Sequence, residues 1–176
     1  MSKKWRVFIC VFLSGICIAM NQFKLIPISQ EMMEAMSLNR TQMGMLTTVF
    51  SIAEAVVILP AAVILCRLRE RKTTLLALVC ALAGTVLGGL STNFQVLLAS
   101  RILEGIGVAL IAVVLPTLPV CYFPEGEQGK PMGLQAGYIS LSVLLIFNVA
   151  VPLERLFHTM KSIWFFAGAT HLILFI

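Results

Sequence analysis

The chain has 176 residues, of which 59% are hydrophobic and only 12% are charged, and its formal net charge is +5. Soluble domains carry about 25% charged residues, so these values exclude a water-soluble fold and indicate a protein embedded in lipid. The positive charge is not arranged as a basic stripe with interleaved aromatic residues, which argues against a nucleic-acid partner. The predicted partner is the lipid bilayer.

Six apolar segments follow one another along the chain. They cover about residues 8–23, 43–65, 73–90, 94–120, 132–151 and 162–176. Each is predicted to be a helix, because a segment in lipid must satisfy its own backbone hydrogen bonds and needs about 20 apolar residues to cross. The first follows MSKKWR and could be a signal peptide, but it runs into polar residues without a small-residue cleavage site. We therefore expect an all-α polytopic membrane protein with six transmembrane helices.

Basic residues in the connections predict the orientation, because cytoplasmic loops of membrane proteins are enriched in Lys and Arg. One side carries Lys3, Lys4, Arg6, Arg67, Arg69, Arg71, Lys72 and Lys130. The other side carries Lys24, Arg40, Arg155 and Lys161. This excess predicts a multi-pass protein of the plasma (inner) membrane with a cytoplasmic N-terminus.

An internal repeat relates the two halves of the chain. Residues 13–20, LSGICIAM, align with residues 103–110, LEGIGVAL, and similar pairs continue between residues 43–73 and 132–162. Because each copy contains three spans, the copies would cross the membrane in opposite directions, as two inverted three-helix repeats. By this alignment the last helix would end near about residue 179. We therefore interpret the chain as an incomplete piece of a longer protein.

Arg101 and Glu104 are the charged pair of the fourth segment. They are three residues apart, so they lie on one helical face and can reach each other. Arg101 lies about 10 Å into the segment from Phe94. A charge at mid-bilayer costs about 2.5 to 3.5 kcal/mol on insertion scales, so it usually faces a protein interior or an aqueous cavity. The pair is a candidate substrate or coupling site, with a structural link between helices as the alternative.

Glu54 is the carboxylate of the second segment. It is either a titratable coupling site or a neutral hydrogen-bond donor, since desolvation favours the protonated form of a buried carboxyl group. The candidate cavity-lining residues are Asn21, Gln22, Gln135 and Tyr138. Polar amides also hold transmembrane helices together, so a packing role remains open for them.

Glycines and prolines mark expected packing and bending positions. Candidate helix-packing glycines are Gly84, Gly88, Gly105, Gly107, Gly133 and Gly137, since a missing side chain allows close helix approach. Pro116 and Pro119 are expected to bend the fourth helix.

Enzymatic chemistry finds no support in the chain, which contains no Asp and only two His. No HExxH, GxSxG, P-loop or CxxC pattern occurs, and the five Cys are scattered through apolar surroundings. We therefore predict a protein that is not an enzyme and that has no cofactor and no metal.

Two motifs resemble those of the major facilitator superfamily of transporters. RILEGIGVAL is similar to that family's fourth-helix motif, with Arg101 followed by Gly105 and Gly107. AVILCRLRERKTTLL is similar to the family's loop between spans two and three, approximately G-x-L-A-D-R-x-G-R-R/K. It keeps Arg67, Arg71 and Lys72 as a cytoplasmic loop motif, but has Ala62 and Arg69 in place of the two Gly and Cys66 in place of the Asp. The gating contact that the family's Asp implies is therefore not carried over.

The resemblance implies the N-terminal half of a twelve-span secondary transporter that works by alternating access, as a symporter or antiporter. Its implied partners are a small-molecule substrate, H⁺ or Na⁺, and a missing C-terminal six-helix half. Residues 122–137 resemble the nitrate/nitrite, cyanate and organic-anion branches, which indicates a small anionic substrate. The alternatives are a non-transporting membrane subunit, a self-pairing six-helix half-carrier, and a drug or metabolite efflux carrier.

Overall fold

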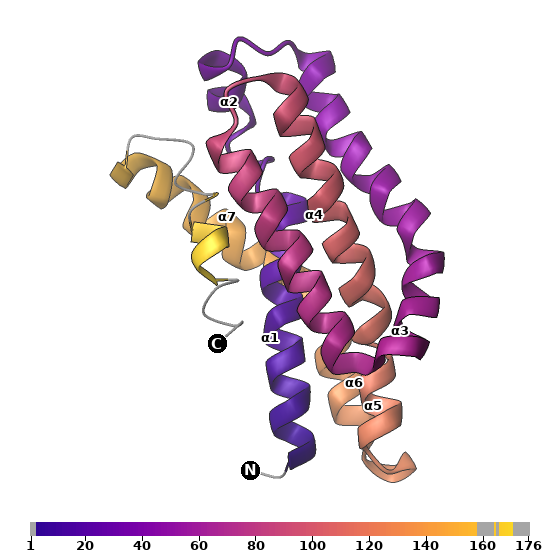
Figure 1. Cartoon of the computed structure of the whole chain (residues 1–176). Helices are drawn as coiled ribbons and strands as arrows, with labels where there is room; N and C mark the ends of the chain where they lie inside the picture. The colour runs from indigo at the N-terminus through magenta and orange to yellow at the C-terminus, as the bar shows by residue number, and fades with distance from the viewer. Residues whose placement is uncertain (1–2, 158–163, 165, 171–176) are drawn as a thin grey trace.

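The computed structural model describes residues 3–157, 164 and 166–170, and these residues form helices joined by short connections (Figure 1). The elements are α1 (Lys3–Phe23), α2 (Ser29–Ala35), α3 (Arg40–Leu90), α4 (Phe94–Val114), α5 (Thr117–Tyr122), η1 (Glu125–Glu127), α6 (Gly129–Ala136) and α7 (Tyr138–Phe157). Within the described part no strand occurs, as predicted for an all-α protein.

Helix α3 consists of two limbs that meet at Arg69. This residue has φ 61° and ψ 171°, whereas residues 40–68 and 70–90 are helical. Figure 1 shows α3 turning back on itself, so that its two limbs run in opposite directions. The predicted spans 43–65 and 73–90 correspond to these limbs. Helix continues up to Arg69 on both sides, so the connection between these two spans is shorter than the interval between residues 65 and 73.

The next two predicted spans are each interrupted. The fourth breaks between α4 and α5 at Leu115 and Pro116, where the proline lacks the N–H that a continuous helix requires. The bend expected from Pro116 is therefore present, and Pro119 lies within the short α5. The fifth, predicted as one helix over residues 132–151, divides at Gly137 into α6 and α7.

Helix lengths and composition identify the membrane-crossing elements. Four helical stretches are long and apolar enough to cross: Lys3–Phe23, Arg40–Leu90, Phe94–Tyr122 and Gly129–Val149. The stretch Arg40–Leu90 contains both limbs of α3, which reverse at Arg69. The predicted sixth span, residues 162–176, lies mostly outside the described residues.

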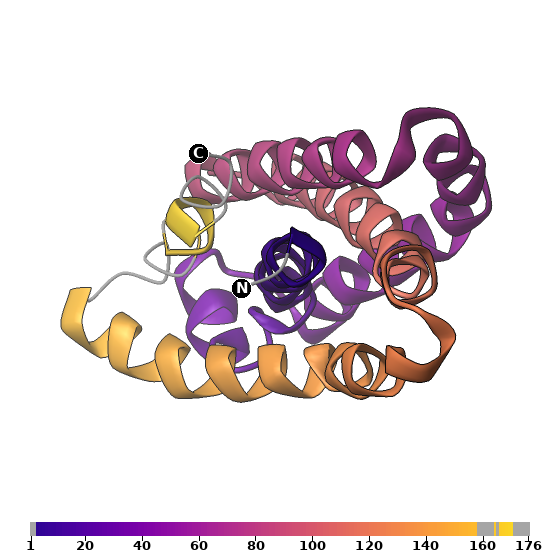
Figure 2. The ribbon, with the colours of Figure 1, turned by 90° about the horizontal axis from the view of Figure 1, so that it is seen from below.

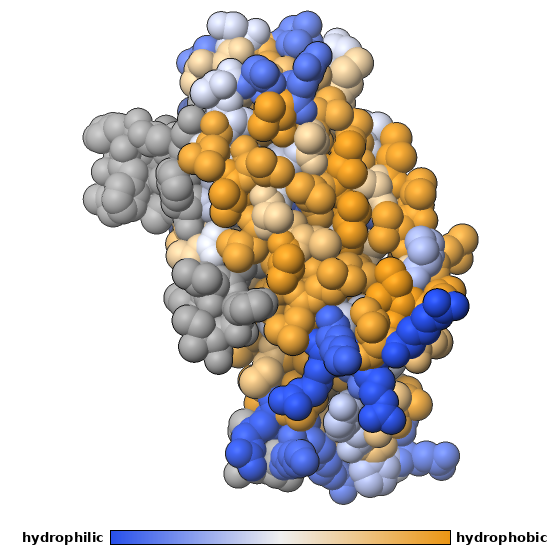
Figure 3. Space-filling model, viewed as in Figure 1, coloured by the Kyte–Doolittle hydropathy of each residue, from blue (hydrophilic) through white to orange (hydrophobic). Residues whose placement is uncertain are grey.

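The surface carries the pattern that a bilayer requires. Large apolar side chains face outward, among them Leu59 at 78% exposure and Val56 at 66%. Figure 3 shows apolar residues over the middle of the visible face and hydrophilic residues toward its two ends. An apolar band of this kind is stable only against lipid or another apolar surface.

Glycines place α4 between the two limbs of α3. A Cβ at Gly105 would lie 2.7 Å from the Phe50 carbonyl oxygen of the first limb. A Cβ at Gly107 would lie 2.9 Å from the Ala77 carbonyl oxygen of the second limb. Helix α1 lies near the centre of the arrangement when it is viewed along its axis (Figure 2). The core therefore forms where α1, α3 and α4 meet.

Two of the predicted packing glycines do not lie at helix contacts. A Cβ at Gly133 would meet nothing within 4 Å, and one at Gly137 would meet only the Leu134 carbonyl oxygen, at 3.5 Å. The packing prediction is wrong for these two within the described residues, because Gly133 lies on an exposed face of α6 and Gly137 at the break after it.

Candidate functional site

Three fully buried charged side chains meet where the end of α1 packs against α4. Lys24, Arg101 and Glu104 each have 0% exposure. The Lys24 ammonium group pairs with Oε1 of Glu104, and Nη1 of Arg101 pairs with Oε2 of the same carboxylate. One carboxylate therefore bridges two cations from different segments, Lys24 in the turn after α1 and Arg101 in α4. We call these three residues the ionic cluster.

Asn21 and Thr85 surround the ionic cluster with polar groups. Nη2 of Arg101 donates to the Asn21 backbone carbonyl at 2.9 Å, and Lys24 Nζ donates to Asn21 Oδ1 at 3.0 Å. The Thr85 hydroxyl lies 3.2 Å from Glu104 Oε1 and 3.3 Å from Asn21 Oδ1. These contacts join α1, the second limb of α3 and α4 through one polar network.

Two aromatic rings cover the cations of the cluster. The Arg101 guanidinium lies 4.6 Å from the ring centroid of Phe50, and the Lys24 ammonium lies 4.8 Å from that of Trp164. Cations at these distances are attracted to the negative face of an aromatic ring. Two buried donors, Arg101 Nε and Trp164 Nε1, have no hydrogen-bond acceptor among the described residues.

With Lys24 and Arg101 protonated, the ionic cluster carries two positive charges and one negative charge. The described side chains provide no second carboxylate in an ion pair with either cation. A buried charge without a counter-charge costs several kcal/mol, even after relaxation. Among the described side chains, and with both cations protonated, the cluster is therefore a buried site with an excess of one positive charge.

Lys24 is the site residue that the sequence interpretation missed. It was assigned to an outer connection because it follows the last apolar residue of the first segment. In the structure its side chain is fully buried against Asn21, Glu104 and Trp164, and the neighbouring Leu25, Ile28 and Met32 are 0–1% exposed. The available signal was the three-residue spacing from Asn21, which places both side chains on one helical face.

The other candidate residues lie apart from the ionic cluster. Glu54, on the first limb of α3, is half-buried and acts electrostatically on the hydroxyl group of Tyr138 on α7. Gln22 and Gln135 are half-buried on α1 and α6. The candidates thus divide into Arg101, Glu104 and Asn21 at the ionic cluster, and Glu54, Tyr138, Gln22 and Gln135 away from it.

Gly84 and Gly88, which form a GxxxG pair, lie next to the ionic cluster. A Cβ at Gly84 would lie 2.6 Å from Glu104 Cγ, and one at Gly88 would collide with the Trp164 indole. Small residues here let the second limb of α3 approach both α4 and Trp164. A larger side chain would displace the groups that hold Glu104 and Lys24.

The basic loop motif is exposed. Arg67, Arg71 and Lys72 all face solvent beside the reversal at Arg69. The φ/ψ region of Arg69 is essentially confined to glycine. Arg69 is also the position at which the related loop motif has its second Gly, so the departure from the motif falls where the backbone most favours Gly.

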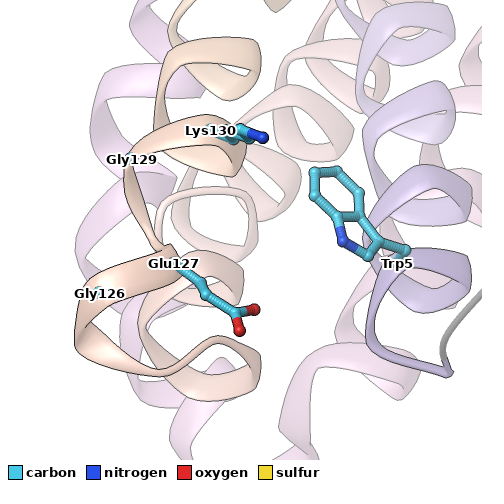
Figure 4. A pocket seen from close by; sticks show the side chains of 5 residues that line it. All are labelled: Trp5, Gly126, Glu127, Gly129 and Lys130. Carbon is cyan, nitrogen blue, oxygen red and sulfur yellow. The ribbon is translucent and has the colours of Figure 1, made fainter.

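The described residues line more than one cavity. One, of about 520 Å³, lies between Trp5 of α1 and Gly126, Glu127, Gly129 and Lys130 (Figure 4). The other, of about 370 Å³, has an almost entirely apolar lining that includes Thr85 and Trp164. The second cavity therefore reaches two residues that contact the ionic cluster.

A family model described as the Major Facilitator Superfamily matches residues 7–176. The chain therefore belongs to this superfamily of membrane transporters, whose members are not enzymes. It is 28% identical over 137 residues to the uncharacterized MFS-type transporter YcnB of Bacillus subtilis (strain 168), covering 77% of this chain and 29% of that protein. For the uncharacterized MFS-type transporter YhcA of the same organism, identity is 27% over 134 residues, with 76% and 25% covered.

Solved structures show the same fold. A bacterial homolog of the human lysosomal transporter Spinster matches in its inward-facing, unoccupied conformation with a TM-score of 0.83 at 19% identity. Its inward-facing, occupied conformation matches with a TM-score of 0.82 at 20% identity. Each match covers 99% of this chain but only 43% and 44% of the other, so the chain spans less than half the length of these relatives.

Proposed function

We propose that the chain forms the N-terminal half of a secondary transporter that moves a small anion by alternating access, coupled to an ion gradient. In this proposal six spans form two inverted three-helix repeats, and a second six-helix half completes the substrate path. The N-terminus lies in the cytoplasm, and the protein resides in the plasma membrane. Membership of the superfamily and the partial coverage of its relatives support this proposal.

The observation that carries the anion assignment is the ionic cluster. An arginine buried in a membrane protein needs acceptors, and Arg101 retains an Nε donor without one among the described residues. Its guanidinium group is suited to carboxylate or similar planar anions, which it can bind through two parallel hydrogen bonds. We assign Arg101 and Glu104 to substrate binding or coupling, and Asn21 to the same site.

Glu54 is proposed as a second coupling site. Its half-buried position and its electrostatic interaction with Tyr138 suit a carboxylate that exchanges H⁺ or Na⁺ during transport. Gln22 and Gln135 are proposed to line the same path. Replacing Glu54 with Gln in the completed carrier should flatten the pH dependence of transport. An unchanged pH profile would reject proton coupling at this residue.

The decisive experiment uses proteoliposomes that contain the completed carrier and a panel of small anions, neutral solutes and cations. We expect uptake or exchange of an anion. Arg101→Ala should abolish transport, and Arg101→Lys should restore only part of it if the substrate is held by two parallel hydrogen bonds. Arg40→Ala, at an exposed cation, is the matched control. Full transport by Arg101→Ala at normal expression, or transport of cations alone, would contradict the assignment.

A further inference from the structure

We propose that Lys24 makes the ionic cluster a combined proton and anion site, which binds one monovalent anion when Lys24 is protonated and none when Lys24 is neutral. This inference rests on the proposed function and extends it to a substrate class, a monovalent anion, and to a stoichiometry of one proton per anion.

Charge balance is the first argument. With Lys24 protonated, the two cations of the cluster exceed Glu104 by one unit, all at 0% exposure. A buried excess charge is removed either by loss of a proton or by arrival of a counter-ion. Arg101 cannot lose its proton in a protein, whereas a buried lysine can. Lys24 is therefore the group that sets the charge of the site.

The two neutral states define the transport stoichiometry. In one state Lys24 holds no extra proton and no anion is bound. In the other, the Nζ lone pair of Lys24 has accepted one proton and one monovalent anion pairs with the resulting cation. No covalent bond forms or breaks apart from this N–H bond. The proton and the anion enter together, so no net charge moves with the loaded site.

The polar atoms around Lys24 leave one of its donors for an anion. An ammonium group has three N–H donors, and Asn21 Oδ1 and Glu104 Oε1 accept two of them. The Trp164 ring lies 4.8 Å away, and its Nε1 is a buried donor without an acceptor among the described residues. The apolar cavity of about 370 Å³ is lined by the same Trp164. Trp164 therefore contacts both this cavity and the Lys24 ammonium group.

Iodide is the probe, because it is a monovalent anion that quenches indole fluorescence. The chain has two Trp residues, so Trp5→Phe leaves Trp164 as the only reporter. Trp164 is 3% exposed, which protects it from quenchers that act by collision alone. Iodide is titrated against the purified chain in detergent at constant ionic strength, from about pH 6 to about pH 10, a range that reaches toward the ordinary pKa of Lys. Acrylamide and caesium serve as neutral and cationic quenchers.

We expect saturable quenching by iodide and weak quenching by acrylamide and caesium. Once the pH is high enough for Lys24 to be neutral, the iodide affinity should fall about tenfold per pH unit, because binding is linked to the uptake of one proton. Lys24→Met should abolish the saturable component. Lys24→Arg should keep it and remove its pH dependence, because Arg stays charged. Arg40→Met removes an exposed cation and should change nothing. Helix content and elution volume check that each variant is folded.

Equal iodide quenching in the folded Lys24→Met variant, or the same pH profile in Lys24→Arg as in the parent, would overturn the inference. The proposed function is tested separately by transport. A completed carrier that transports an anion while the chain fails to bind iodide at Lys24 rejects the inference alone. Iodide binding at Lys24 together with a completed carrier that transports no anion rejects the proposed function.

Discussion

Replacing Glu104 with Gln should be the most destabilising single change in the ionic cluster. The substitution keeps the size of the side chain and removes only its charge. Lys24 and Arg101 then remain buried, both positive, with no carboxylate between them. Removing one partner of a buried ion pair typically costs about 3 to 5 kcal/mol, because it leaves an uncompensated charge. We expect a loss in that range.

The companion variant should behave differently. Lys24→Met leaves Arg101 and Glu104 as a neutral pair, and Met fills much of the same space. A neutral, well-packed replacement for a buried charge is often tolerated or stabilising, so we expect a change within about 1 kcal/mol. The double variant, Glu104→Gln with Lys24→Met, keeps only Arg101 charged and should recover part of the loss.

Thermal unfolding in detergent, followed by helical circular dichroism, measures these differences. For a chain of this size, 1 kcal/mol corresponds to about 2 to 4 °C in Tm, so Glu104→Gln should melt at least about 6 °C lower. The deficit should shrink at high pH, because a neutral Lys24 removes one of the two uncompensated cations. A Tm for Glu104→Gln equal to that of the parent, or an equal loss in Lys24→Met, would refute the charge argument.

Three further variants test the backbone, the packing and the surface. Arg69→Gly should stabilise the chain by about 1 kcal/mol. It relieves about 1 to 3 kcal/mol of backbone strain, which outweighs the conformational entropy that Gly loses on folding. A lower Tm would show that this turn is not strained. Gly105→Ala should destabilise the chain, because the new Cβ would lie 2.7 Å from the Phe50 carbonyl oxygen of α3. Gly133→Ala meets open space and should be neutral or stabilising. Equal Tm values for the two variants would contradict the close approach of α4 to α3 at Gly105. Glu127→Gln breaks the partly exposed pair with Lys4 and should change stability by less than about 1 kcal/mol, while a larger loss of Tm would assign that pair a structural role.

Much of the fold follows from local sequence. A run of about 20 apolar residues must become a helix when lipid is its solvent, and this places the crossing segments regardless of their neighbours. The pairing of Arg101 with Glu104 also follows, since three residues on a helix bring two side chains onto one face. Their burial was expected for the same reason, because charge in an apolar segment needs a protein interior.

Tertiary structure decided what sequence spacing leaves open. Lys24 follows its apolar segment and has the pattern of a solvent-exposed end. It is nevertheless fully buried, because its ammonium group pairs with Glu104 from a helix eighty residues later. Gly84 and Gly133 each begin the same GxxxG pattern, but only Gly84 meets another helix. Helical periodicity defines a face, and only the packing of distant segments decides what that face contacts. The excess charge of the ionic cluster arises from such a contact.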